Sequence, residues 1–391
     1  MKYEQVKLKD VIFFNPKETI KKNQLTKKIP MDALIPFTRK VRYYEVKEFS
    51  SGTKFRNNDI LMARITPCLE NGKTAYVDIL NEDEVAFGST EYFVLRANEN
   101  YILPKYLYYL SISDGLRNIV IKSMTGTSGR QRAQKEAVLD FEIELPSISI
   151  QKKVLSILDS IDSKIELNNQ IISNLEELAS TLFKRWFVDF EFPDENGNPY
   201  KSSGGKMVDS ELGEIPNDFN VQALHESIEV KYGKDHKKLD DGEFPVYGSG
   251  GLMRFAESYL FSGESVLIPR KGSLNNIMYV NESFWTVDTM FFTKMKKKNI
   301  AKFIYLLLKK VDLASMNVGS AVPSMTTAIL NSMPIIMPFD SILEHFEKII
   351  LPVFMLKNNY EIENKTLADL RDSLLSKLLS GEIELPEDEE V

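Results

Sequence analysis

The chain has 391 residues, enough for two or three domains that each bury a core. With 43% hydrophobic and 27% charged residues, it has no apolar run of the roughly 18 residues that a membrane span needs. The lone Cys68 excludes an internal disulfide, and the three histidines lack metal-ligand spacing, so we expect no metal site. The first ten residues lack the apolar segment of a secretory signal, which favours a cytoplasmic protein without membrane contact.

The net charge of −7 is unevenly distributed along the chain. Residues 1–147 carry 23 Lys and Arg against 19 Asp and Glu, and residues 201–340 carry 16 of each. Residues 148–200 carry 5 against 9, and residues 341–391 carry 5 against 12. Two neutral or basic segments therefore alternate with two acidic ones. This pattern is compatible with DNA binding, because basic residues are needed only where phosphates lie.

The first predicted unit is a mixed domain over residues 1–147. Short β-branched and aromatic runs such as Ala75-Tyr-Val-Asp-Ile79, broken by Gly, Asn and Asp, predict strands. One internal helix is expected near residues 104–113, and Pro146 marks the end of the domain.

A long helix is predicted over residues 148–190. Apolar residues recur at alternating steps of four and three, which is typical of a helix packed against another long helix. The seam consists of Val154, Leu158, Ile161, Ile165, Asn168, Ile172, Leu175, Ala179, Leu182 and Trp186. Its one polar member, Asn168, is expected to lower stability while fixing register and partner number. The alternative is a long core helix of a single globular domain.

The second half is predicted to repeat this order. Residues 191–220 have the Pro, Gly and Ser content of a linker, and residues 221–340 form a second strand-rich domain with a helix near 300–310. Residues 341–381 form a second, less regular helix, in which Pro352 must lie in the first turns or cause a kink. Gly381 is a plausible helix end, and residues 382–391 form an acidic tail.

Five segments of the first half recur in the same order in the second half. They are Asp59–Arg64 with Ser265–Arg270, Ser89–Arg96 with Val287–Lys294, Leu103–Leu110 with Ile300–Leu307, Gly126-Thr127 before Phe141–Pro146 with Gly319-Ser320 before Met333–Pro338, and Leu167–Ile171 with Lys357–Glu361. Each match is weak, but five in one order indicate an internal duplication. We therefore predict an α+β fold: two mixed α/β domains alternating with two long helices that pair as an antiparallel coiled coil, with a pseudo-twofold repeat. Two similar domains related by a pseudo-twofold axis suit two half-sites on duplex DNA, because the duplex also has twofold symmetry.

Several longer motifs are more specific than the repeat. They are Gly126-Thr-Ser-Gly-Arg-Gln-Arg132, Ile143-Glu-Leu-Pro146, Gln151, Ile165-Glu-Leu-Asn168, Leu175-Glu-Glu-Leu178, Leu182-Phe-Lys-Arg-Trp-Phe187, Met207-Val-Asp-Ser-Glu-Leu-Gly-Glu-Ile-Pro216, Phe244-Pro-Val-Tyr-Gly-Ser-Gly-Gly251 and Val322-Pro-Ser-Met325. In these motifs, and over almost its whole length, the sequence resembles the specificity subunits of type I restriction–modification systems. It departs from them in the second helix, which has Pro352 and no Gln near its start.

The resemblance implies that each half is a target recognition domain that reads one part of a divided double-stranded DNA sequence. It also implies that the two long helices form a spacer that docks two methyltransferase subunits, which restriction subunits then join. S-adenosylmethionine, ATP and Mg are expected on those partners only. This chain is expected to hold no cofactor and to perform no chemistry.

Candidate DNA contacts are cations for phosphates and forked donors for base edges. In the first half they are Arg64, Arg130, Gln131 and Arg132, and in the second half Tyr247, Ser249, Arg270, Lys271 and Ser273. Each set has an alternative interpretation: a solvated surface loop around Arg130, and a tight turn that merely lets strands meet around Ser249. Arg39, Arg42 and Lys54, near Tyr43-Tyr44, are secondary candidates.

Two other classes of function compete with DNA reading. A two-lobed coiled-coil scaffold without DNA specificity fits the helices but leaves the basic, glycine-rich loops unexplained. A single-chain modification enzyme is disfavoured because the sequence has no Asp/Asn-Pro-Pro-aromatic signature and no phosphate-binding loop.

Overall fold

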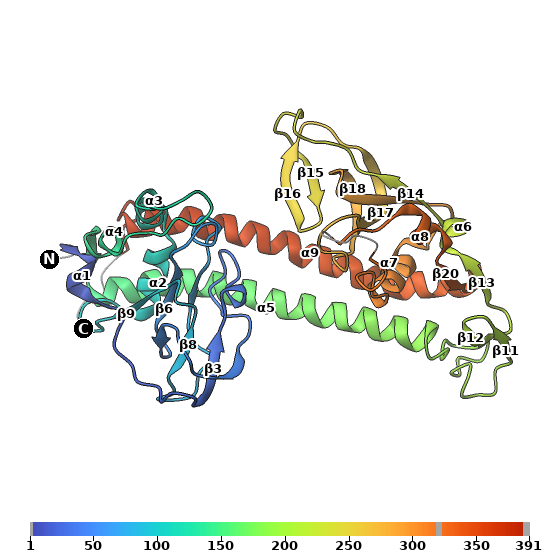
Figure 1. Cartoon of the computed structure of the whole chain (residues 1–391), viewed down its shortest axis with the longest axis horizontal. Coiled ribbons are helices and arrows are strands. Elements are labelled where there is room, and N and C mark those ends of the chain that lie inside the picture. The colour runs from blue at the N-terminus through green and yellow to red at the C-terminus, as the bar shows by residue number, and fades with distance from the viewer. Residues whose placement is uncertain (1–2, 318–322, 386–391) are drawn as a thin grey trace. The chain divides into compact units, whose positions relative to one another are not determined.

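A computed structural model describes residues 3–317 and 323–385 of the chain, which divides into two compact units. Unit 1 contains the residues up to 168 and from 362 onward, and unit 2 contains residues 169–361. Two helices of 40 residues, α5 (Ile148–Phe187) and α9 (Asp340–Leu379), each contribute a part to both units (Figure 1). The predicted fold class, two mixed domains alternating with two long helices, is confirmed. Over the described residues, no helix is both long and apolar enough to span a membrane.

The heptad seam of α5 faces the interior along its whole length. Val154, Leu158, Ile161, Asn168, Ala179 and Trp186 are buried, and Ile165, Ile172, Leu175 and Leu182 are half-buried. Both ends of the seam pack into a domain core as well as against α9. Val154 and Leu158 join the core of unit 1, and Ala179 and Trp186 join the core of unit 2.

The two long helices run antiparallel to each other within each unit. In unit 1, Asp162 of α5 pairs with Arg371 of α9 over 3.0 Å, and Asn168 donates to Glu363 over 2.8 Å. In unit 2, Glu176 pairs with Lys357 over 2.8 Å. Residue numbers thus rise along α5 as they fall along α9, as predicted. Pro352 lies inside α9 rather than in its first turns, and the helix continues through it.

The part of unit 1 outside the long helices, which we call domain 1, contains two four-stranded sheets and a short strand pair. The first sheet has the order β2 (Ile12–Phe14), β9 (Tyr92–Ala97), β6 (Ile60–Ala63) and β7 (Thr74–Tyr76), and the second has the order β4 (Glu45–Glu48), β3 (Leu25–Ile29), β8 (Ala86–Gly88) and β5 (Lys54–Phe55). The pair is β1 (Tyr3–Lys7) with β10 (Glu142–Pro146), and the helices are α1 (Leu8–Val11), the 3-10 helix η1 (Met31–Ala33), α2 (Pro104–Ile112), α3 (Asp114–Lys122) and α4 (Lys135–Leu139). Helix α2 confirms the internal helix that the sequence predicts.

The corresponding part of unit 2, which we call domain 2, contains one six-stranded sheet. Its order is β14 (Ile228–Tyr232), β19 (Met290–Met295), β17 (Phe261–Pro269), β18 (Met278–Thr286), β15 (Phe244–Gly248) and β16 (Gly251–Ala256). Strands β13 (Asn220–Ala223) and β20 (Pro334–Met337) form the short pair, and the helices are α6 (Leu224–Ser227), α7 (Ala301–Lys310) and α8 (Thr327–Ser332). Helix α7 confirms the second internal helix.

The sequence repeat corresponds to a repeat of strand register. In domain 1, Ala63 of β6 is paired with Tyr92 of β9, and in domain 2, Pro269 of β17 is paired with Met290 of β19. The sequence matches align these same positions. Strands β6 and β17 share little sequence but have the same register with their neighbours. A shift by one residue would turn the apolar side chains of a buried strand away from the core.

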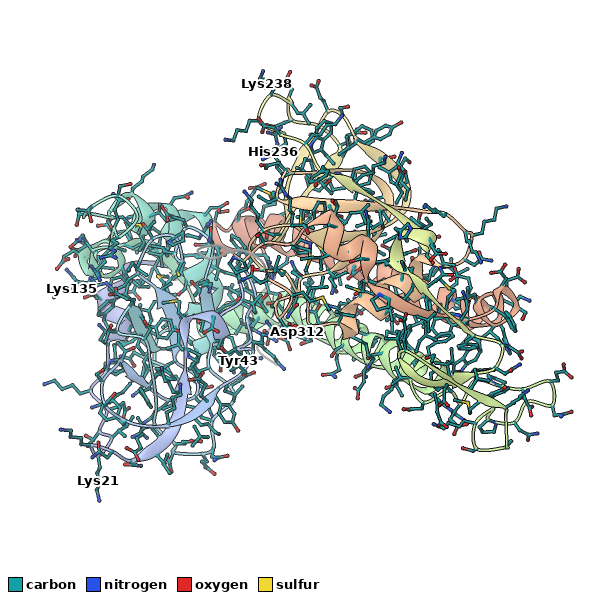
Figure 2. All side chains as sticks on the ribbon, turned by 45° about the vertical axis from the view of Figure 1, so that its right-hand side comes forward. Lys21, Tyr43, Lys135, His236, Lys238 and Asp312 are labelled. Atoms are coloured by element: carbon teal, nitrogen blue, oxygen red, sulfur yellow. The ribbon has the colours of Figure 1, made fainter. Side chains whose placement is uncertain are left out.

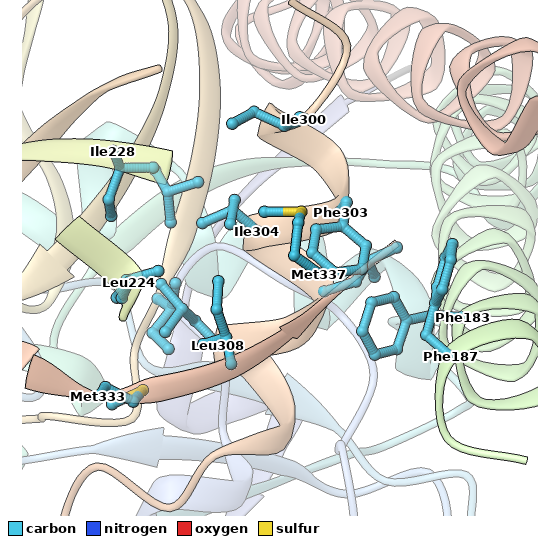
Figure 3. Packing of buried hydrophobic residues seen from close by; sticks show 14 of the residues in the cluster. Phe183, Phe187, Leu224, Ile228, Ile300, Phe303, Ile304, Leu308, Met333 and Met337 are labelled. Atoms are coloured by element: carbon cyan, nitrogen blue, oxygen red, sulfur yellow. The ribbon is translucent and has the colours of Figure 1, made fainter. Parts of the chain in front are cut away.

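The core of unit 2 is formed around α7. Phe303, Ile304 and Leu308 of α7 pack with Phe183 and Phe187 of α5 and with strand residues (Figure 3). The segment that composition predicts as a linker, residues 191–220, contributes to this core as well. It contains the hairpin β11 (Met207–Ser210) and β12 (Gly213–Pro216), and Phe192 stacks on Phe219 with ring centroids 5.1 Å apart.

Three predicted features fall on residues outside the described ranges. They are the second copy of the glycine pair, Gly319-Ser320, the first residue of the Val322–Met325 motif, and the end of the acidic tail from residue 386. Within the described range, Gly381 has a φ of +73°, which is the left-handed conformation that commonly ends a helix. Ile383 and Leu385, which follow it, pack against the core of unit 1.

Candidate nucleic-acid interface

In domain 1, one loop cluster surrounds Arg64, the residue that follows β6. The backbone N–H of Arg64 donates to the carbonyl of Glu91 over 3.0 Å, and its carbonyl accepts from the N–H of Ala133 over 2.8 Å. The guanidinium lies 4.8 Å from the centroid of the Phe93 ring. Backbone hydrogen bonds on both sides therefore fix a cation that rests on an aromatic face.

The glycine-containing loop of residues 125–132 closes on itself beside Arg64. Thr125 and Arg132 exchange two backbone hydrogen bonds of 3.0 and 2.9 Å, and the N–H of Thr66 donates to the carbonyl of Gln131 over 3.0 Å. Arg130 is exposed, and within residues 3–317 and 323–385 its guanidinium has no ion-pair partner. The structure thus brings Arg64, Gln131 and Arg132 together and leaves Arg130 open to solvent.

Arg132 does not present a free guanidinium. It donates to Glu91 through two nitrogens, with N–O distances between 2.7 and 3.0 Å. These hydrogen bonds lower the pKa of the Glu91 carboxyl, so the pair is fully charged at neutral pH. Reading a base with Arg132 requires this pair to open or to act as a unit, in which Glu91 accepts from a cytosine amino group.

In domain 2, Arg270 after β17 repeats the environment of Arg64. Its backbone N–H donates to the carbonyl of Thr289 over 2.8 Å, and its carbonyl accepts from the N–H of Met325 over 2.8 Å. Its guanidinium lies 5.3 Å from the centroid of the Tyr232 ring. Arg64 and Arg270 are aligned by the sequence repeat, and each sits in the same backbone frame within its own domain.

The structure also brings together Ser249 and the segment that follows Arg270. The carbonyl of Ser249 accepts from the side-chain amide of Asn276 over 2.9 Å. Gly272 has a φ of +86°, and a Cβ at this position would lie 3.1 Å from Ser249 Oγ, so a side chain there would be strained and crowded. Lys271 and Ser273 on either side are exposed, so three of the predicted contacts share one loop cluster.

Tyr247 lies near this cluster in sequence but has another partner. Its hydroxyl donates to Glu282 of β18 over 2.6 Å, and burial together with this hydrogen bond raises the pKa of the phenol. Tyr247 thus ties β15 to β18 through its side chain.

Arg39 is buried, which contradicts its interpretation as a secondary DNA contact. Its side chain is 7% exposed and pairs with Asp159 and Glu166 of α5 over 2.6 and 2.7 Å. A guanidinium held in this way is not available to a phosphate. Lys54 is engaged as well, because its ammonium donates to the carbonyl of Glu18 over 3.1 Å.

Sequence reasoning missed several members of these clusters. Glu91, Phe93, Tyr232 and Asn276 are ordinary residues of strands and loops, and only the fold places them beside Arg64, Arg270 or Ser249. The repeat was the one usable signal, since it aligns Glu91 with Thr289, whose carbonyls play the same part.

Other exposed cations lie elsewhere on the two domains. Lys135 begins α4, three residues after the loop of residues 125–132, and Lys238 lies on the connection between β14 and β15 (Figure 2). Among the described residues, no group of three or more His, Cys, Asp or Glu side chains is placed to hold a metal ion.

Comparison of the sequence with known proteins finds relatives over most of the chain. A family model described as the type I restriction modification DNA specificity domain matches residues 1–177 and 216–370. The chain is 26% identical to the specificity subunit of the type I restriction enzyme HindI of Haemophilus influenzae, over 84% of this chain and 87% of that protein. It is 25% identical to the MjaIX specificity subunit of Methanocaldococcus jannaschii, over 73% of this chain and 70% of that protein.

A solved structure shares the fold. The type I restriction-modification S subunit from M. genitalium superposes with a TM-score of 0.54 and covers 96% of each chain, at 18% sequence identity. The order of two mixed domains and two long helices is therefore retained where most side chains have changed.

Proposed function

Because the chain belongs to the type I restriction–modification DNA specificity family, we propose that each of its two domains reads one part of a divided, asymmetric DNA target. The observation that carries this assignment is the repeated frame around Arg64 and Arg270. In each domain an arginine follows the same strand, lies over an aromatic ring and is flanked by a glycine-containing loop. Because the loops differ in sequence, the two half-sites differ as well.

The exposed members of each cluster divide into two roles in this proposal. Arg130 and Lys271, which are exposed and carry no ion pair within the described part of the chain, contact phosphates or base edges directly. Gln131 and Ser249 supply neutral donors and acceptors beside them. Arg64 and Arg270 are more restrained, so they provide a fixed positive charge against which the backbone of the DNA is positioned.

The long helices dock the partner subunits in this proposal. Several large apolar side chains on them are exposed and belong to neither domain core: Leu167 and Leu178 on α5, and Leu351, Met355, Leu356, Ile362 and Leu370 on α9. Exposed apolar groups that gather on one element favour a protein interface. We assign this surface to two methyltransferase subunits, which restriction subunits join.

Chemistry belongs to those partners in the same proposal. S-adenosylmethionine, ATP and Mg bind to the methyltransferase and restriction subunits, and this chain contributes recognition alone. The acidic charge of residues 148–200 and 341–391 supports the division of labour, because an acidic spacer does not itself hold DNA.

A DNA-binding titration with and without the methyltransferase tests the assignment. The chain with its methyltransferase should bind and methylate one divided sequence, with an affinity that falls as salt rises. The purified chain alone, incubated with S-adenosylmethionine and DNA, should transfer no methyl group. Sequence-independent binding by the complex would contradict the assignment of specificity, and methyl transfer by the isolated chain would contradict its non-catalytic role.

A further inference from the structure

Domain 1 contains an insertion that domain 2 lacks. Strand β3 pairs antiparallel with β4 and parallel with β8, and strand β15 pairs antiparallel with β16 and parallel with β18, so the two hairpins occupy equivalent places. In domain 2 the hairpin is closed by residues 249–250. In domain 1 it is closed by residues 30–44, which we call the strap and which includes Tyr43 (Figure 2).

The strap is bound to both long helices within unit 1. Arg39 donates to Asp159 over 2.6 Å and to Glu166 over 2.7 and 3.1 Å, and both carboxylates belong to α5. The carbonyl of Phe37 accepts from Arg371 of α9 over 3.4 Å. Phe37 itself has a φ of +55°, a strained conformation for a bulky residue that persists only where its surroundings enforce it.

The other side of the strap is bound to the segment that leads to Arg64. The N–H of Tyr76 in β7 donates to the carbonyl of Arg39 over 2.9 Å, and the N–H of Phe37 donates to the carbonyl of Gly72 over 3.0 Å. The N–H of Ala63 in β6 donates to the carbonyl of Lys73 over 3.0 Å. Residues 63–76 therefore form one hairpin with Arg64 at the start of its connection and the strap along its far strand.

The hairpin of domain 2 makes a different set of contacts. Its turn residue Ser249 accepts from Asn276 and lies beside Gly272, both within the loop cluster of its own domain. The segment that closes the hairpin therefore contacts the loop cluster in domain 2, whereas in domain 1 the corresponding segment, the strap, contacts the long helices.

We propose that the strap is a positioning element that sets the orientation of the domain 1 reading loops on the paired helices, and that Arg39 is its principal positioning residue. The inference rests on the function proposed above. A hydrogen bond to a base edge weakens steeply when its distance or angle leaves a narrow range, so a displaced reading loop discriminates less between bases. Loss of the Arg39 anchor should therefore relax base discrimination in the half-site that domain 1 reads and leave the other half-site unchanged.

Arg39→Ala is suited to the test because its partners keep other cations. Lys105 lies 2.5 Å from Asp159, and Lys40 lies 3.1 Å from Glu166, so neither carboxylate becomes an isolated buried charge. The variant is expected to fold and to assemble with the methyltransferase.

The experiment measures methylation by the complex of chain and methyltransferase on duplexes in which one half-site at a time carries a base substitution. Gln131→Ala and Ser249→Ala, which remove the neutral donors and acceptors proposed to face base edges, identify the half-sites of domains 1 and 2. In the Arg39→Ala complex, the ratio of cognate to substituted rates should fall about tenfold in the half-site that Gln131→Ala affects, and should stay at the wild-type value in the other.

Arg56→Ala is the matched control. Arg56 pairs with Glu18 inside domain 1 over 2.8 Å, and Glu18 keeps Arg96 at 2.8 Å, so this carboxylate does not become an isolated charge either. The change removes an arginine ion pair from domain 1 without releasing the strap. If Arg39→Ala yields little soluble complex, Glu166→Ala removes one of the two anchors and should give a smaller loss in the same half-site. Unchanged discrimination, an equal loss in both half-sites, or the same loss in Arg56→Ala would each overturn the proposal. A wild-type complex without half-site discrimination would instead refute the proposed function.

Discussion

The side-chain amide of Asn168 in α5 donates a hydrogen bond of 2.8 Å to Glu363 in α9. The same nitrogen also donates to Asn364 over 2.9 Å, while its Oδ1 is buried without a hydrogen-bond partner. Asn168, a polar residue on an apolar seam, therefore donates both of its amide hydrogen bonds to the opposite helix. This arrangement selects a register, and the unpaired oxygen lowers stability.

Asn168→Leu should raise the thermal unfolding midpoint, because it removes the unpaired buried oxygen while Glu363 keeps Lys164 as a partner at 3.3 Å. The expected gain is about 1 kcal/mol. Asn168→Asp should lower the midpoint, since it places a carboxylate against Glu363. Differential scanning calorimetry of the two variants checks this pair of opposite signs, and a decrease in both would show that the amide is a net stabiliser.

The length of the long helices should set the gap between the two half-sites in the proposed function. Seven helical residues correspond to about 10 Å, or about three base pairs. Because Asn168 of α5 lies against Asn364 of α9, a heptad must be removed from both helices to keep these two residues paired. Deleting residues 169–175 with residues 357–363 should shorten the unread gap and keep both half-sites.

Methylation mapping by the complex that contains this double deletion measures the gap. Deletion of residues 169–175 alone is the control and should abolish assembly or recognition, because it shifts the partners on α5 past those on α9. A gap of unchanged length in the double deletion would show that the helices do not determine it.

Arg130→Ala should weaken binding to the cognate sequence by about 1–3 kcal/mol if its guanidinium reads a base edge. The loss should then disappear on targets that are already substituted at the base it reads. A uniform loss on all sequences would assign Arg130 to a phosphate. Lys22→Ala, which removes an exposed cation from another turn of domain 1, is the control and should bind like the wild type.

The pair of Arg132 and Glu91 should make domain 1 sensitive to acid. The hydrogen bonds from Arg132 hold the pKa of Glu91 below the ordinary value of 4.5, so its contribution to stability is complete above that pH and is lost as pH falls through the lowered pKa. Glu91→Gln should therefore lower the unfolding midpoint at pH 7 and leave it unchanged below the lowered pKa.

Thermal unfolding at a series of pH values from 7 downward follows this difference. Glu99→Gln replaces an exposed carboxylate that has no ion pair within the described residues and should match the wild type throughout. A difference between Glu91→Gln and wild type that grows on acidification would contradict the assigned sign.

The features that follow from periodicity could be predicted from the sequence. The heptad steps from Val154 to Trp186 predicted the long helix and the burial of Asn168. An apolar seam of this length is removed from water only when it packs against another element along its whole length. The repeat predicted that Arg64 and Arg270 are equivalent, since matched strands keep matched register.

The features that depend on tertiary contacts could not be predicted in this way. Arg39 and Arg130 are both arginines in polar stretches, yet one is buried against α5 and the other is exposed. The difference arises because residues 30–44 are folded back onto the helices, which no local pattern encodes. In the same way, the engagement of Arg132 by Glu91 depends on a turn residue that lies 41 residues away along the chain.

The core of unit 1 is assembled from both ends of the chain. Leu375 and Leu378 of α9 are buried beside Leu8, Ile60 and Val154. During synthesis on the ribosome, the domain that emerges first therefore waits with an open core until the residues near 378 have been made, whereas residues 169–361 form an uninterrupted unit that is complete earlier. The middle of the polypeptide should mature before its beginning, and the nascent amino-terminal domain is the part that needs protection from premature association.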